Sequence, residues 1–127
     1  MPVNALKATA LAAVLALVAV APAVARQAPL DSYCATLSAR DHFNSNGQRL
    51  TTTAAIIRQD RANYHKFRRR DPGDQGDSFF SLQANRARLE ALIADGSSDP
   101  GVLRRIVNGE PRICVDIWDN YVNVTVD

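Results

Sequence analysis

The sequence predicts an α+β fold in which three to four short helices pack on a C-terminal antiparallel β-hairpin over about residues 112–126, with one disulfide. Three observations predict it. Apolar and polar residues alternate on both sides of a two-residue turn near the C-terminus, and apolar residues recur at helical spacing in three earlier segments. The third observation is a pair of cysteines, one near each end of the part that folds.

The hairpin is centred on Asp119 and Asn120, two residue types that tolerate the positive φ of a tight turn. This turn pairs Trp118 with Tyr121 and sets every earlier pair in register. One face of the hairpin is then entirely apolar: Ile113, Val115, Ile117, Val122, Val124 and Val126. Because a lone hairpin is marginal in water, we expect helices over this face or a third strand beside it.

Two of the helical segments have clear boundaries. Residues 77–96 open with Asp77 as an N-cap, carry apolar residues at helical spacing and end at Gly96. Residues 99–109 open with an Asp-Pro pair, which suits the first turn of a helix, and end at Gly109. We therefore expect one helix over each of these two segments.

The third helical segment, residues 52–67, is less regular because Asp60 and Arg61 interrupt its apolar stripe. A polar pair on an inward face needs hydrogen-bond partners or a function, so Asp60 is a group to inspect. The preceding residues 31–46 fit a helix or a strand equally well, and the sequence leaves both open.

The first 25 residues have the pattern of a cleavable secretory signal peptide. Of these residues, 20 are apolar and only Lys7 is charged, and residues 23–25 form an A-x-A cleavage site. The apolar run is short for a membrane-spanning helix. We expect cleavage near Ala25, a single small domain over residues 26–127, and a periplasmic or secreted location with no stable membrane span after processing.

The charge of the chain limits the kinds of molecule that it can be expected to bind. Without Lys7, the chain carries 14 Lys and Arg against 13 Asp and Glu, so the part that folds is nearly neutral. This balance argues against nucleic acid as a partner, because it leaves no global basic field. Of the 15 basic residues in the whole chain, 13 are Arg, whose planar fork suits carboxylate, phosphate and sulfate groups. Electrostatic recognition must therefore come from local clusters.

Cys34 and Cys114 are the only cysteines in the chain. Their spacing is far from the C-x-x-C of a redox pair, and an exported chain folds where cysteine pairs close. We therefore predict a structural disulfide between them. Closing so long a loop stabilises a fold by about 4.5 kcal/mol according to the chain-entropy relation.

Basic residues cluster between positions 58 and 70. On a helix, four of them fall near one face: Arg58, Arg61, His65 and Arg69. We expect this stripe to bind an anionic glycopolymer, a lipid headgroup or an acidic protein, which makes the chain a non-enzymatic binding module. The alternative is a solvated helix face whose cations complement the helix dipole.

A small hydrolase or lyase is the competing hypothesis, with His42 or His65 acting together with Asp41 or Asp60. The sequence has no G-x-S-x-G elbow, no H-E-x-x-H helix and no phosphate-binding glycine loop beside these residues. We therefore assign no catalytic residue. Asp41 and His42 join Asp60 as polar groups whose partners the structure must show.

The acidic loop 71–77 carries carboxylates at every third position. A calcium loop needs acids at alternate positions and a distal Glu, which this loop lacks. We therefore expect a turn here, and we expect neither a metal nor a cofactor.

The hairpin itself offers two further functional alternatives. Trp118 and Tyr121 form either a cross-strand pair that stabilises the hairpin or a stacking platform for a sugar or a partner. The free edge of the hairpin suits an inhibitor or assembly partner that adds a strand to it. The sequence leaves the oligomeric state open.

Overall fold

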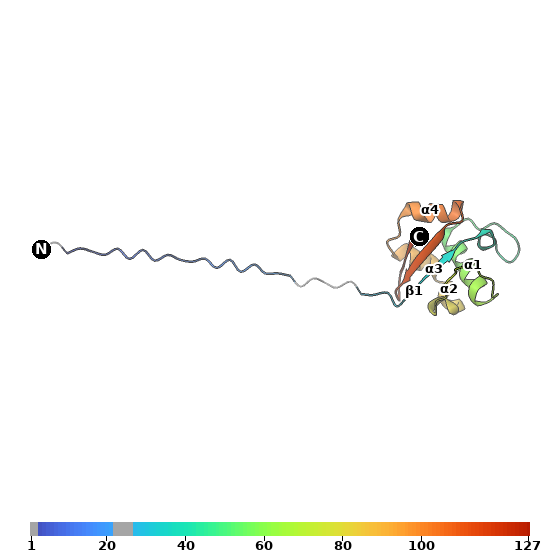
Figure 1. Ribbon diagram of the computed structural model, residues 1–127, viewed down its shortest axis with the longest axis horizontal. Helices are drawn as coiled ribbons and strands as arrows, with labels where there is room; N and C mark the ends of the chain where they lie inside the picture. Colours follow the sequence, from blue (N-terminus) through green and yellow to red (C-terminus); the bar gives the residue numbers. More distant parts are fainter. Residues whose placement is uncertain (1–2, 22–26) are drawn as a thin grey trace.

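The computed structural model describes residues 3–21 and 27–127. Residues 3–21 form neither helix nor strand and extend away from the folded domain (Figure 1). The expected cleavage position near Ala25 lies outside the described residues. Among the residues that the structure describes, none of the helices has the length and hydrophobicity of a membrane span.

Residues 27–127 combine a three-stranded antiparallel sheet with short helices, so the predicted α+β fold class is confirmed. The strands are β1 (Asp31–Thr36), β2 (Arg112–Ile117) and β3 (Val122–Val126), in the order β1-β2-β3. The α-helices are α1 (Thr53–His65), α2 (Gln83–Arg86), α3 (Leu89–Asp95) and α4 (Pro100–Asn108). Two 3-10 turns are η1 (Ala39–His42) and η2 (Phe79–Ser81).

The β2–β3 hairpin has the predicted register. Ile113 lies opposite Val126 at one end, and beside the turn the Trp118 N–H donates to the Tyr121 carbonyl at 3.0 Å. The turn residues 119–120 do not have the positive φ that a tight two-residue turn requires. The register therefore follows from the alternation of side chains rather than from the geometry of the turn.

The strand β1 resolves the ambiguity over residues 31–46, which form a strand followed by η1. It pairs with β2 so that Cys34 lies directly opposite Cys114, with their Cα atoms 4.0 Å apart, and the predicted disulfide joins them. The disulfide therefore joins the third strand to the hairpin.

The core lies between the apolar face of the sheet and the helices α1, α3 and α4, which gather around the strands in Figure 1. Its fully buried side chains come from every strand, from these helices, from η2 and from the residue after β1: Tyr33, Ala35, Leu37, Ile56, Ile57, Phe80, Leu89, Leu92, Ile106, Ile113, Val115, Ile117, Val122 and Val124. The opposite face of the sheet carries the disulfide, Asp116 and Trp118, and it remains partly open to solvent.

The helices α1 and α4 occur where the sequence predicts them. The Thr52 side chain accepts a hydrogen bond from the Ala55 N–H, and the Asp99 carboxylate accepts one from the Gly101 N–H. Each of these bonds satisfies an N–H group that the first turn of a helix leaves free.

The prediction of one continuous helix over residues 77–96 is wrong, because the segment is divided into η2, α2 and α3. The Arg86 guanidinium donates to the carbonyls of Phe80 and Ser81, and the Asn85 amide donates to the Phe79 carbonyl. In a continuous helix these carbonyls would accept from backbone N–H groups four residues later. Side chains take those acceptors here, so the helix breaks.

Both outer edges of the sheet are engaged by loops. The loop 71–77 lies along β1, where the Cys34 N–H donates to the Gln75 side chain and the Cys34 carbonyl accepts from the Gln75 N–H, each at 2.9 Å. On the far edge, the Val124 N–H donates to Ser98 Oγ at 2.9 Å. The predicted turn at 71–77 therefore also covers the outer edge of β1.

Candidate functional site

Arg61, which the helical stripe placed with exposed cations, is fully buried at 0% exposure. Its guanidinium lies 3.8 Å from the centre of the Tyr33 ring. Its Nε donates to Asp60 at 2.8 Å, and its Nη1 donates to Asp77 at 3.0 Å. The expectation of a surface contact through Arg61 is therefore wrong, since this residue pairs with carboxylates inside the protein.

His65 belongs to the same internal network. Its Nε2 lies 2.8 Å from the Asp77 carboxylate oxygen that also accepts from Arg61, and its side chain is 13% exposed. The second Asp77 oxygen accepts from the Phe80 N–H, as the sequence expects of an N-cap. Asp77 thus joins the end of α1 to the start of η2.

Asp60 joins this network through its ion pair with Arg61. Burial raises the pKa of Asp60 to about 7, and the positive charge of Arg61 opposes that rise. Burial and the neighbouring carboxylates also raise the pKa of Tyr33 well above its usual range, against the effect of Arg61. The inward polar pair noted in the sequence has therefore found partners, and it lies within the core.

His42 is also structural. It is buried, and its Nδ1 and Nε2 lie 2.8 Å from the backbone carbonyls of Ser38 and Ile106 respectively. Among the described residues, neither histidine hydrogen-bonds to Asp41 or Asp60. The geometry therefore supplies none of the His–Asp pairs that the hydrolase hypothesis names. The pair that does form, His65 with Asp77, already holds Arg61.

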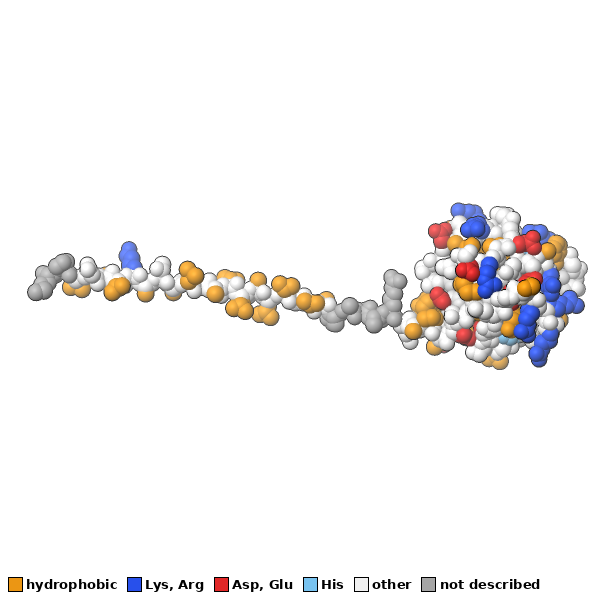
Figure 2. All heavy atoms as spheres, viewed as in Figure 1, with side chains coloured by type: hydrophobic (Ala, Val, Ile, Leu, Met, Phe, Trp, Pro, Cys, Tyr) orange, Lys and Arg blue, Asp and Glu red, His pale blue; other side chains and the backbone are white. Residues whose placement is uncertain are grey.

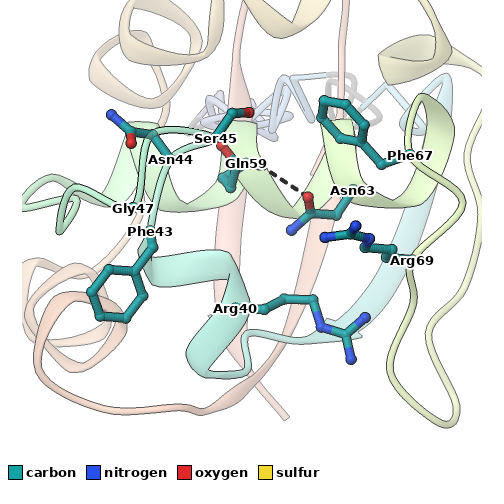
Figure 3. A pocket seen from close by; sticks show the side chains of 9 residues that line it. All are labelled: Arg40, Phe43, Asn44, Ser45, Gly47, Gln59, Asn63, Phe67 and Arg69. Atoms are coloured by element: carbon teal, nitrogen blue, oxygen red, sulfur yellow. Dashed lines mark hydrogen bonds between the residues drawn. The ribbon is translucent and has the colours of Figure 1, made fainter.

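A cleft opens at the other side of α1, and we call it the α1 cleft (Figure 3). It has a volume of about 450 Å³. Its walls come from η1, the loop that follows η1, the second half of α1 and the segment after that helix: Arg40, Phe43, Asn44, Ser45, Gly47, Gln59, Asn63, Phe67 and Arg69. Arg69 is one of the four cations that the sequence singled out.

The end of α1 explains how Arg69 reaches the cleft. Arg68 has a φ of 57°, the left-handed conformation that reverses a chain at a helix end. The reversal lets the Arg69 N–H donate to the Asn63 carbonyl at 2.8 Å. The Arg69 side chain then points back across the last turns of α1 toward the Asn63 amide, as Figure 3 shows.

The wall from η1 and the floor are held by hydrogen bonds. Arg40 lies in η1, where the Asp41 carboxylate accepts from the Ser38 N–H at 3.0 Å. The same carboxylate accepts from the Asn63 amide at 2.8 Å, and Asn63 accepts from the Gln59 amide at 2.9 Å. This chain of bonds fixes both amide side chains that form the floor.

The α1 cleft is basic. Two guanidinium groups line it and no carboxylate does, and Arg40 and Arg69 form no ion pair within residues 27–127. The nearest acid along the hydrogen-bond chain is Asp41, behind Asn63, and burial raises the pKa of its carboxyl. Phe43 and Phe67, 38% and 42% exposed, add apolar surface at the rim.

The four cations of the predicted stripe therefore separate in the structure. Arg61 and His65 lie inside, Arg69 lines the α1 cleft, and Arg58 lines a smaller cavity at the start of α1. Figure 2 shows Lys and Arg in separate groups among Asp and Glu on the face in view. Sequence reasoning missed Arg40, although its place directly before the Asp41-His42 pair was a usable signal.

The edge of β3 offers little room for an added strand. The Val124 N–H donates to Ser98 Oγ. Next to this bond, the Ser97 N–H donates to Asn123 Oδ1 at 2.7 Å. Gly96 approaches so closely that a Cβ built on it would lie 1.9 Å from the Val122 carbonyl oxygen. The segment after α3 thus occupies the edge that an inhibitor or assembly partner would need.

Comparisons with protein-family models, with curated proteins and with solved structures find no match for this chain. Within the described ranges, no group of three or more His, Cys, Asp or Glu is arranged to hold a metal ion. The clefts are therefore the features whose chemistry indicates a function.

Proposed function

We propose that this protein is an exported binding module whose α1 cleft takes an anionic group, a carboxylate, phosphate or sulfate, of a glycopolymer, a lipid headgroup or an acidic protein. The proposal keeps the class of ligand that the sequence indicates. It moves the contact from an exposed helix stripe to the cleft between η1 and the end of α1.

One observation carries the proposal: Arg40 and Arg69 reach the same cleft from different elements and have no carboxylate partner there. An arginine fork binds carboxylate and phosphate oxygens with two parallel hydrogen bonds. Two forks that line one cleft favour an anion bound by both.

The floor and rim add selectivity. The Gln59 and Asn63 amides are oriented by bonds to each other and to Asp41, so they can donate to and accept from polar groups beside the anion. The exposed rings of Phe43 and Phe67 suit an apolar or ring-shaped neighbour of that anion. Acidic sugars and acidic side chains next to apolar residues have this chemistry.

Export is supported by two features. The first 25 residues have the composition of a signal peptide, and the disulfide between Cys34 and Cys114 suits an oxidising compartment. We therefore place the proposed ligand in the periplasm or outside the cell.

Titration calorimetry at one fixed salt concentration tests the proposal, with polygalacturonate and poly-L-glutamate as carboxylate probes, dextran sulfate as a sulfate probe, and neutral dextran as the blank. We expect Arg40→Gln and Arg69→Gln each to weaken binding of at least one anionic probe about tenfold, because each removes a charge-assisted fork. Vesicles with and without an anionic phospholipid test the headgroup source.

Arg104→Gln is the matched control, since Arg104 is an exposed arginine of α4 that does not line the α1 cleft. It removes the same charge and should leave binding within about twofold of the parent. Equal weakening by all three variants would show a diffuse electrostatic effect and overturn the proposal, as would equal binding of neutral dextran.

A further inference from the structure

A second cleft with the opposite chemistry lies at the end of the hairpin, and we call it the hairpin cleft. It has a volume of about 610 Å³. Its lining comes from the chain before β1, the end of α3 and the outer side of β2 and β3: Gln27, Asp95, Gly96, Ser97, Asp116, Trp118, Tyr121 and Asn123. None of these residues lines the α1 cleft.

An aromatic pair forms one wall. The Trp118 and Tyr121 rings are stacked, with centres 4.7 Å apart and planes 12° apart, and both side chains are only partly buried. The Trp118 indole N–H donates to the Gln27 carbonyl at 3.0 Å, which fixes the ring in place. The wall is therefore a π surface, whose negative face attracts cations.

Two carboxylates complete the cleft. Asp95 and Asp116 are exposed and form no ion pair within residues 27–127, and no Lys or Arg is among the lining residues. Asp95 is brought to the hairpin because Gly96 packs against the Val122 carbonyl, where a side chain would not fit. The Ser97 N–H bond to Asn123 holds the same segment.

This combination distinguishes between kinds of ligand. A neutral sugar would stack on the rings and donate hydroxyl groups to the carboxylates but would leave both negative charges uncompensated, and a metal ion would need more than two acidic ligands for a site of its own. A cation with alkyl groups uses both features, since its charge meets the carboxylates and its carbons meet the rings.

We propose that the hairpin cleft binds an organic ammonium cation, either a lysine side chain of a partner protein or a small quaternary amine. The site is independent of the proposed anion binding, so the protein has two clefts of opposite charge preference. Binding at one cleft does not require binding at the other.

Trp118 is the only tryptophan of the chain, so intrinsic fluorescence reports on this cleft. The purified protein is titrated with choline and, separately, with Nα-acetyl-lysine amide. The neutral isosteres 3,3-dimethylbutanol and Nα-acetyl-norleucine amide serve as matched controls. We expect a saturable change with at least one cation and none with its isostere, and the cation that binds more tightly identifies the source.

Asp95→Asn and Asp116→Asn should each weaken cation binding about three- to fivefold, whereas Glu110→Gln, outside this cleft, should leave it unchanged. A response to the isosteres equal to that of the cations would overturn the proposal. So would saturation by a neutral sugar alone, absence of any saturable response, or full affinity in the Asp95→Asn/Asp116→Asn double variant. The Arg40 and Arg69 variants should bind cations normally, so the two proposals can fail separately.

Discussion

Arg61 is buried and joins α1 to the loop 71–77. Its guanidinium contacts Asp60 in α1, and also the Gln75 carbonyl and the Asp77 carboxylate of the following loop. Removing one member of a buried ion network is costly, because the remaining charges keep their burial and lose their partner.

Arg61→Met is therefore expected to lower the free energy of unfolding by about 3–5 kcal/mol, as the midpoint of urea unfolding would show. Arg58→Met is the matched control, because it makes the same substitution on the exposed side of the same helix. A loss from Arg61→Met within about 1 kcal/mol of the control would contradict the structural role assigned to this residue.

The candidate site could be predicted from the sequence only in part. The helical stripe included Arg69 but grouped it with Arg61, because helical spacing gives the relative direction of side chains and not which direction is inward. The partners of Arg61 come from the loop 71–77, which no local pattern places beside α1. Arg40 lies far from Arg69 in sequence, so their meeting in one cleft depends on how η1 packs against α1.

The secondary-structure elements differ in how far the residues next to them in sequence determine them. The hairpin register and the ends of α1 and α4 follow from alternation and capping residues, and the structure has them as predicted. The break between η2 and α2 comes from Arg86 and Asn85 side chains that compete for helix carbonyls. The strand β1 depends on its partner β2, so residues 31–46 alone could not decide between helix and strand.

Gly96 limits the packing of α3 against β3. Its φ is −86°, which any residue adopts, so the constraint is the 1.9 Å approach of a Cβ to the Val122 carbonyl. We expect Gly96→Ala to destabilise the protein by about 1–3 kcal/mol in chemical unfolding, since the end of α3 must move away from the sheet.

Gly109→Ala is the control for the effect of the substitution on the unfolded chain. A Cβ at Gly109 would lie 3.3 Å from its nearest neighbour, the Arg105 carbonyl, so only a slight adjustment is needed. Equal stabilities of the two alanine variants would show that α3 does not depend on this close approach.

At the scale of the whole molecule, the disulfide joins two strands that are 80 residues apart in sequence. The bond restricts the conformations of the unfolded chain more than those of the folded chain. This restriction matters for a small domain because its hydrophobic core is small. The pairing of β1 with β2 and the bond between Cys34 and Cys114 therefore support each other.

Reduction of the disulfide is expected to lower the free energy of unfolding by about 2–5 kcal/mol, measured as a shift of the urea midpoint between oxidised and reduced protein. The Cys34→Ala/Cys114→Ala variant should unfold as the reduced protein does and should not respond to reductant. Coincident unfolding curves for oxidised and reduced protein would contradict this account.

The loops that lie along β1 and β3 affect how readily copies of the protein associate with one another. Strand edges with free N–H and C=O groups act as templates on which other chains add by backbone pairing, the route to edge-to-edge aggregation. Here Gln75 occupies one margin of the sheet and Ser98 occupies the other. A three-stranded sheet protected in this way can remain small and still resist aggregation when the protein is concentrated.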